Sequence, residues 1–193
     1  MKNIVIAGVG GQGTLLSSVI LGQVALKLGY DVKISEVHGM AQRGGSVVTY
    51  VRIGDKGEKV YSPIIDPGQA DILLGFEQLE TLRWLPYAGK DCKIYSNTQQ
   101  ILPMPVITGA AKYPDDIPGT VKKHFDDAVF VDALSLAVQA GSVRAVNVVL
   151  LGVMAKEMDI DEAVWMDVIG STVKPAFKEI NEKAFLLGNK EVI

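Results

Sequence analysis

The first residues that could do chemistry form a glycine-rich segment near the N-terminus. Gly8-Val9-Gly10-Gly11-Gln12-Gly13 follows an apolar run at residues 3–7 and precedes Thr14, with the spacing G-x-G-x-x-G. Glycines let backbone N–H groups approach a ligand closely, and the N-terminus of a following helix attracts anions. Close packing between a strand and a helix explains the same glycines equally well. If a ligand binds here, the predicted contacts are Gly8, Gly10, Gly11, Gln12, Gly13 and Thr14.

A second segment gathers polar and titratable side chains at residues 35–46, which read SEVHGMAQRGGS. It follows a predicted strand, and ligands of open α/β sheets bind at the carboxyl ends of strands. Arg43 can pair with a carboxylate or phosphate, and His38 can donate or transfer a proton, so these two are the candidates for a catalytic role. An ion pair between Arg43 and Glu36 in a surface loop is the alternative. The predicted contacts in this segment are Glu36, His38, Gln42, Arg43, Gly44, Gly45 and Ser46.

Glu36 also keeps a different function open. It falls near the end of the second predicted strand, where dinucleotide-binding proteins place an acid that binds the ribose. Together with Gly8, Gly10 and Gly13, it favours a free-standing oxidoreductase that binds NAD(P) or a flavin. The additional Gly11 and the amide of Gln12 depart from common dehydrogenase loops.

The elements that must position these residues alternate between strands and helices. Runs of β-branched residues predict strands, and apolar residues at helical spacing predict helices. This alternation predicts an α/β fold: one Rossmann-like domain over residues 1–193, with an open, mostly parallel sheet and helices on both faces. A turn at residues 54–57 predicts a hairpin returning at 59–61, and the irregular stretch 100–120 should hold a short strand near Val106 and Ile107. We expect strands at 3–7, 31–37, 46–53, 70–74, 92–95 and 128–131, and helices at 14–28, 76–85, 132–140, 145–156, 161–171 and 174–187.

Composition excludes several classes of function. The 193 residues carry a net charge of −3 without a cluster of Lys and Arg, so nucleic-acid binding is not expected. The longest apolar stretch, residues 148–155, is far shorter than the ~20 residues needed to span a membrane. The single cysteine, Cys92, cannot form a disulfide within the chain or supply the four thiolates of an iron–sulfur cluster. We therefore expect a cytoplasmic protein with no metal centre of its own.

Taken together, the two motifs resemble the gamma subunit or domain of 2-oxoacid:ferredoxin oxidoreductases. The resemblance rests on the glycine segment at residues 8–13 and on HGMAQRGG at residues 38–45. It continues through 62–63, 70–77, 79–83, 144–147, 151–152 and 181–188, and so covers nearly the whole chain. As a stand-alone chain of this length that carries HGMAQRGG, the sequence is most similar to the indolepyruvate-oxidising branch of the family.

The resemblance implies a specific activity. Such enzymes decarboxylate a 2-oxoacid with coenzyme A and ferredoxin, giving an acyl-CoA, carbon dioxide and reduced ferredoxin. Thiamine diphosphate with Mg²⁺ and [4Fe–4S] clusters would lie in a large alpha subunit, and this chain would be the small subunit, inactive alone. The glycine segment would contact coenzyme A or the partner, and residues 36–46 would face a shared active site. A non-catalytic assembly module of the complex remains an alternative.

Overall fold

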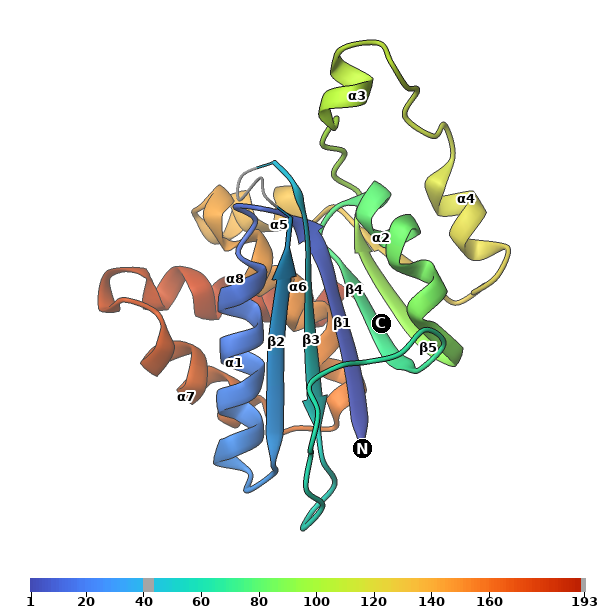
Figure 1. Cartoon of the computed structure of the whole chain (residues 1–193). Helices are drawn as coiled ribbons and strands as arrows, with labels where there is room; N and C mark the ends of the chain where they lie inside the picture. The colour runs from blue at the N-terminus through green and yellow to red at the C-terminus, as the bar shows by residue number, and fades with distance from the viewer. Residues whose placement is uncertain (40–43, 192–193) are drawn as a thin grey trace.

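The computed structural model describes residues 1–39 and 44–191. Within these residues, six strands form one sheet in the order β2-β3-β1-β4-β5-β6 (Figure 1). The pairs β1–β4, β4–β5 and β5–β6 are parallel, whereas β3 runs antiparallel to both of its neighbours, β1 and β2. The prediction of an open, mostly parallel α/β sheet is confirmed. The strands are β1 (Lys2–Val9), β2 (Val32–His38), β3 (Ser46–Ile53), β4 (Ala70–Gly75), β5 (Ala88–Asn97) and β6 (Val129–Val131).

Strand β1 shows why the sheet is covered on both faces. Successive side chains of a strand point to opposite faces, and in β1 both sets are apolar and buried. Ile4 and Ile6 join one hydrophobic cluster, and Val5 and Ala7 join the other. A strand of this kind must lie inside the sheet with a layer packed on each side.

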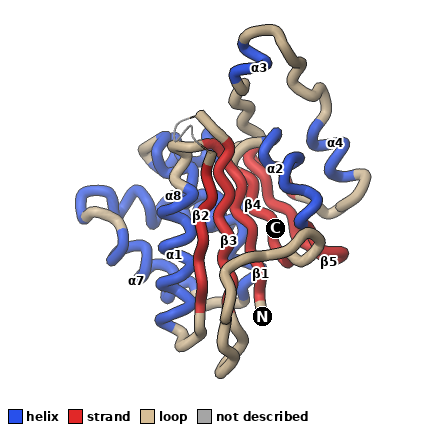
Figure 2. The backbone as a smooth tube through the Cα atoms, in the orientation of Figure 1, coloured by secondary structure: helices blue, strands red, loops and turns tan. Residues whose placement is uncertain are grey.

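The helices supply those two layers (Figure 2). The cluster around Ile4 and Ile6 packs against five helices, and the cluster around Val5 and Ala7 packs against α2 (Gln78–Trp84) and α4 (Ile117–Lys122). Helices on both faces were predicted, and this is confirmed. A one-turn helix, α3 (Met104–Ile107), stands away from the sheet in Figure 1. The five helices of the first layer are α1 (Thr14–Lys27), α5 (Ala133–Ala140), α6 (Val146–Ala155), α7 (Glu162–Thr172) and α8 (Lys178–Glu191).

Short 3₁₀ helices connect several of these elements. They lie at Leu85–Tyr87, Val143–Ala145, Lys156–Met158 and Pro175–Phe177. The last of them precedes α8, so the helix predicted from residue 174 begins as a 3₁₀ turn. Helix α4, which begins within the stretch 100–120 predicted to be irregular, was missed.

The predicted strand near Val106 and Ile107 is wrong. The Ile107 N–H donates to the Pro103 oxygen at 3.1 Å, and the Thr108 N–H donates to the Met104 oxygen at 2.9 Å, so these residues form helix α3. Proline fits the first turn of a helix, where its missing N–H has no partner to lose. Two β-branched residues after Pro105 are too few to make a strand without a neighbouring strand edge.

The predicted hairpin strand at residues 59–61 is also wrong. Strand β3 lies between β2 and β1, which occupy both of its edges, so residues 59–61 have no strand to pair with. The hairpin partner of β3 is β2, with Val37 opposite Val48. As a result β2 runs parallel to β1 but lies one strand away from it.

Candidate functional site

A pocket of about 430 Å³ lies at the carboxyl end of β1, where the glycine segment turns into α1. Its walls come from that turn, the end of β2 and the start of β3. Ligands of open α/β sheets bind at this edge, so the pocket is the candidate site. It is lined by Gly10, Gly11, Gly13, Thr14, Leu15, Glu36, His38 and Val47.

The two predicted segments are joined by backbone hydrogen bonds. The Gly10 N–H donates to the Gly45 oxygen at 2.9 Å, and the Gly44 N–H donates to the Gly10 oxygen at 3.3 Å. The Gln12 N–H donates to the Val9 oxygen at 3.1 Å. The N–H groups of Gly10 and Gln12 thus already have backbone acceptors, in Gly45 and Val9, and are not left free to bind a ligand.

Other N–H groups of the turn are free to donate hydrogen bonds to an anion. Those of Gly11, Gly13 and Thr14 have no backbone acceptor among residues 1–39 and 44–191. Gly13 is the residue that precedes α1, and no side chain among the described residues caps this helix. The first N–H groups of a helix lack partners within it and carry its positive dipole end. Hydrogen bonding and charge therefore both favour a phosphate or carboxylate here.

Gly13 is required by close packing with α6. Its φ of 86° lies in the left-handed region, and a Cβ there would lie 2.9 Å from the Asn147 Nδ2 atom. Asn147 is buried, and its Nδ2 lies 3.5 Å from the Gly13 oxygen. Sequence reasoning missed this partner, although an amide within the apolar run of residues 146–151 was a signal.

Gln12 was predicted to contact a ligand, but its side chain points into the protein. The Oε1 atom accepts from the Val9 N–H at 2.7 Å, and Nε2 donates to the Phe76 oxygen at 3.0 Å and to the Gln99 Oε1 atom at 3.2 Å. Gly8 lies beneath it, since a Cβ there would meet the Gln12 Oε1 at 3.0 Å. Gln12 therefore ties the turn to the ends of β4 and β5.

Among the described residues, the predicted contacts Gly44, Gly45 and Ser46 also lie outside the pocket lining. The Ser46 hydroxyl donates to the Glu80 carboxylate in α2, away from the glycine segment. Gln42 and Arg43 lie outside the described residues, and so does the ion pair considered between Arg43 and Glu36.

Two titratable side chains line the pocket within the described part of the chain. Glu36 is half-buried, and its Oε2 lies 3.4 Å from the Thr49 hydroxyl. His38 is exposed, with Nδ1 at 3.1 Å from the Gly39 oxygen. Glu36 can accept a hydrogen bond from a ligand hydroxyl or amide, and the exposed His38 ring can donate one.

Comparison with known proteins identifies the family. The model of the family described as pyruvate ferredoxin/flavodoxin oxidoreductase matches residues 3–191. The chain belongs to this oxidoreductase family. The indolepyruvate oxidoreductase subunit IorB of Pyrococcus horikoshii is 42% identical over 193 residues, which cover 97% of this chain and 94% of that protein. The resemblance to gamma-type subunits found in the sequence is confirmed.

Two solved structures share the fold. The gamma subunit of a keto/oxoacid ferredoxin oxidoreductase from Geobacter sulfurreducens matches with a TM-score of 0.73 at 23% identity, covering 100% of this chain and 98% of that one. The 2-oxoglutarate:ferredoxin oxidoreductase from Magnetococcus marinus matches with a TM-score of 0.72 at 19% identity. That match covers 99% of this chain but only 31% of the other, so there the fold is one part of a longer polypeptide.

The residues of this family member do not fit an iron–sulfur cluster. Cys92 is buried, and burial raises the pKa of its thiol to about 12, whereas a cluster needs several thiolates. Among the described residues, no group of three or more His, Cys, Asp or Glu side chains could hold a metal ion. In the same part of the chain, no helix has the length and apolar character needed to cross a membrane.

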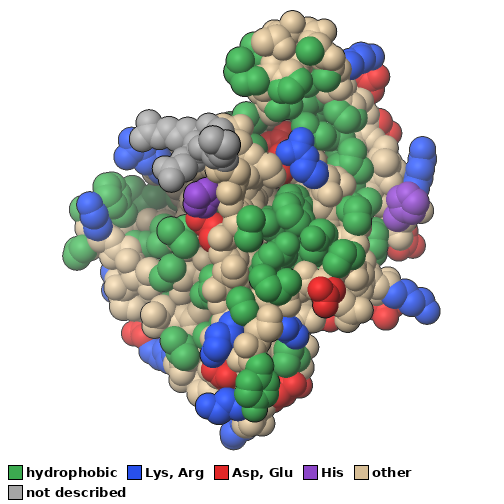
Figure 3. Space-filling view, viewed as in Figure 1, with side chains coloured by type: hydrophobic (Ala, Val, Ile, Leu, Met, Phe, Trp, Pro, Cys, Tyr) green, Lys and Arg blue, Asp and Glu red, His purple; other side chains and the backbone are tan. Residues whose placement is uncertain are grey.

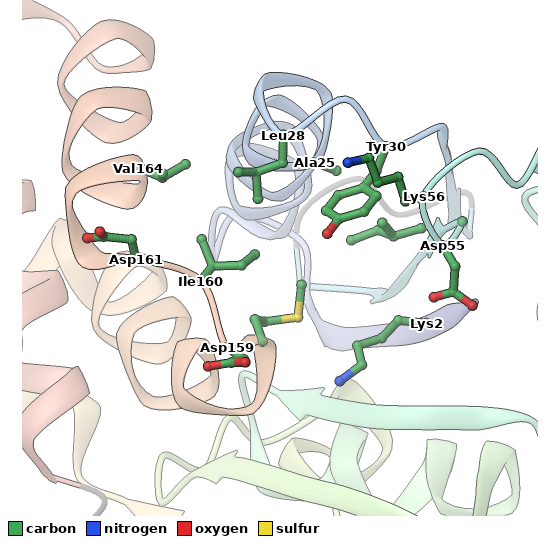
Figure 4. Close-up of a pocket in the computed structure, with 13 residues that line it drawn as sticks. Lys2, Ala25, Leu28, Tyr30, Asp55, Lys56, Asp159, Ile160, Asp161 and Val164 are labelled. Atoms are coloured by element: carbon green, nitrogen blue, oxygen red, sulfur yellow. The ribbon is translucent and has the colours of Figure 1, made fainter.

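A second pocket, of about 330 Å³, lies at the opposite end of the sheet (Figure 4). Lys2 at the start of β1 and Tyr30 just after α1 contribute to it, with Asp159 beyond α6. The pocket is at the amino end of β1, away from the edge where open α/β sheets bind ligands. None of the predicted ligand contacts that the structure describes lines it.

Glu80 is a buried carboxylate at the same edge of the sheet as the candidate site. It is 3% exposed, and it accepts from the Ser46 hydroxyl and, at 2.7 Å, from the Arg83 Nη1. Burial raises the pKa of Glu80, although Ser46 and Arg83 act in the opposite direction. The charged form is therefore disfavoured by folding.

We expect Glu80→Gln to stabilise the protein at neutral pH. A raised carboxyl pKa contributes stability that is present below the unfolded-state pKa and is lost as the pH rises through the folded-state value. Glutamine keeps the acceptor for Ser46 and carries no charge. The melting temperature of Glu80→Gln should exceed that of the wild type at pH 7.5, and the difference should vanish below about pH 4. A variant that is less stable than the wild type at pH 7.5 would contradict this.

Proposed function

We propose that this chain is the small subunit of an indolepyruvate:ferredoxin oxidoreductase. The observation that carries the proposal is the 42% identity to an indolepyruvate oxidoreductase subunit over nearly the full length of both chains. In the reaction, indolepyruvate loses its carboxylate as carbon dioxide and its acyl carbon forms a thioester with coenzyme A. The two electrons released pass to oxidised ferredoxin. The product is indoleacetyl-CoA.

The cofactors of this reaction belong, in our proposal, to a large alpha subunit in the cytoplasm. Thiamine diphosphate with Mg²⁺ supplies the carbanion chemistry when bound, and [4Fe–4S] clusters carry electrons to ferredoxin. The single buried cysteine of this chain supports the placement of the clusters in the partner. The small subunit would then contribute binding surface to a shared site.

The pocket at the glycine turn is our candidate for a contact with coenzyme A. The N–H groups of Gly11, Gly13 and Thr14 are suited to a phosphate of this co-substrate. Glu36 would accept from one of its hydroxyl or amide groups, and His38 would donate to the ligand or the partner backbone. Arg43 and Gln42, which follow in sequence, would add charge and hydrogen bonds.

Reconstitution tests the proposed function. The chain and its larger subunit, purified separately and together, would be assayed for reduction of a viologen dye with indolepyruvate and coenzyme A. We expect turnover only from the mixture, because neither chain alone completes the site. Activity of the isolated small chain, or full activity of the larger subunit without it, would refute the proposal.

A further inference from the structure

Residues 98–116, which we call the arm, extend beyond the sheet between β5 and α4 (Figure 1). The arm leaves the sheet after β5, carries the single turn of α3 and returns to the start of α4. It emerges at the carboxyl end of β5, at the same edge as the glycine turn. A projection of this kind contributes little to the two hydrophobic clusters of the fold.

The tip of the arm exposes large apolar side chains. Leu102, Met104 and Ile107 are 48%, 66% and 61% exposed, and hydrophobic side chains are visible on the arm in Figure 3. Apolar residues gathered on a projecting element are costly in water and mark contact surfaces. The arm therefore presents an unpartnered apolar surface.

The backbone of the tip is ordered by its own hydrogen bonds. The Val106 N–H donates to the Pro103 oxygen at 2.9 Å, and the Ala111 N–H donates to the Pro105 oxygen at 2.9 Å. The ring of each proline restricts its φ. A preformed surface loses less entropy on binding than a flexible one, so this tip is suited to docking.

One buried carboxylate holds both sides of the arm at its base. The Glu77 Oε1 accepts from the Ile101 N–H at 3.0 Å and from the Tyr113 hydroxyl at 2.5 Å, and Glu77 is 1% exposed. Burial and the Glu77 carboxylate raise the pKa of the Tyr113 phenol, so it remains a donor. Glu77 also caps α2 by accepting from the Glu80 N–H at 2.9 Å. The arm is thus fixed to the core rather than attached by its ends alone.

The base of the arm is also bonded to the glycine turn. Gln99 accepts from the Gln12 Nε2 at 3.2 Å, and Gln12 in turn accepts from the Val9 N–H at 2.7 Å. These hydrogen bonds connect the arm to the glycine turn, whose Gly10, Gly11 and Gly13 line the candidate pocket. A partner seated on the arm would be positioned relative to that pocket.

We propose that the tip of the arm, formed by Leu102, Met104 and Ile107, docks into an apolar groove of the larger subunit of the same oxidoreductase. This rests on the proposed function. The same fold makes up only 31% of the Magnetococcus marinus chain, where it is covalently joined to further polypeptide. A separate chain needs a noncovalent surface instead, and the arm offers an apolar one beside the pocket. A larger subunit bound to the arm would lie at the same edge of the sheet as the glycine turn.

The test compares the double variant Met104→Ser/Ile107→Ser with a control, Leu26→Ser. Leu26 is 55% exposed and lies near the end of α1, at the opposite end of the sheet. Binding of each variant to the purified larger subunit would be measured by biolayer interferometry, and melting temperatures would be recorded. We expect the dissociation constant of the double variant to rise about tenfold, since buried apolar anchors dominate interfaces. Leu26→Ser should bind like the wild type, and both variants should melt near the wild-type temperature.

Hydrogen exchange of the wild-type complex gives a readout that does not depend on a variant folding. Residues 102–111 should exchange more slowly in the complex than in the isolated chain. Unchanged exchange there, or an unchanged dissociation constant, would overturn docking through the arm while leaving the turnover of the wild-type complex intact.

A wild-type chain that neither binds nor activates the larger subunit would overturn the proposed function as well. A double variant that alters self-association of the isolated chain would assign the arm to a second copy and overturn our proposal.

Discussion

Replacing Gly188 by alanine should destabilise the protein by about 2 kcal/mol, although alanine is the better helix former. Gly188 lies in α8, where a Cβ would overlap the backbone oxygen of Val149 in α6. Neither a carbonyl nor a helix can move aside as a side chain can, so the two helices must separate, and overpacking of this kind costs typically 1–3 kcal/mol or more. The helix propensity of alanine returns about 1 kcal/mol of that loss. Thermal unfolding should show a melting temperature lower by roughly 4–8 °C.

Gly170→Ala is the matched control for this prediction. Gly170 is also helical, in α7, but a Cβ there meets the flexible end of Lys178 rather than backbone. The same gain in helix propensity should leave this variant as stable as the wild type or more stable. If Gly188→Ala and Gly170→Ala melt at the same temperature, helices α6 and α8 do not approach as closely as the structure shows.

Gly11→Ala should weaken the apparent affinity of the reconstituted enzyme for coenzyme A by roughly ten- to a hundredfold, corresponding to a lost charge-assisted hydrogen bond of about 1.5–3 kcal/mol. Gly11 lines the candidate pocket, and a Cβ there meets no heavy atom within 4 Å. The methyl group would therefore enter open space where an anion is proposed to bind. The KM for coenzyme A in the viologen assay measures this effect, while the KM for indolepyruvate should change little.

Backbone strain must be separated from loss of the contact. Gly11 has a φ of 103°, and alanine in the left-handed region costs roughly 1–2 kcal/mol. Gly29→Ala is the matched control because Gly29 has a φ of 81° and also has open space around a Cβ, but it lies at the other end of α1. Both variants should lose similar thermal stability, and only Gly11→Ala should alter the KM for coenzyme A. Equal KM values for coenzyme A in the two variants and the wild type would show that the glycine turn serves packing rather than coenzyme A binding.

The local elements of the fold were predictable because their signals lie within a few residues. The apolar run, glycines and helical spacing of residues 3–28 predicted β1, the turn and α1, and these are confirmed. The motifs at residues 8–13 and 38–45 also indicated the family, since they combine two specific segments. For the site, sequence reasoning placed Gly10, Gly11 and Gly13 beside Glu36 and His38, and the structure brings these residues to one pocket.

The sequence by itself thus determined the α/β class, most helices and strands, the family and the strand edge that carries the candidate site. The tertiary structure alone decided the insertion of β3 between β1 and β2, because Val51 finds its partners Ile4 and Ile34 through contacts distant in sequence. It also decided that Gln12 points inward and that Glu77 holds the arm. Periodicity reports which face of an element is buried, but not which element covers it. Pairing order, buried polar contacts and close helix crossings depend on residues tens of positions apart, and no local pattern encodes them.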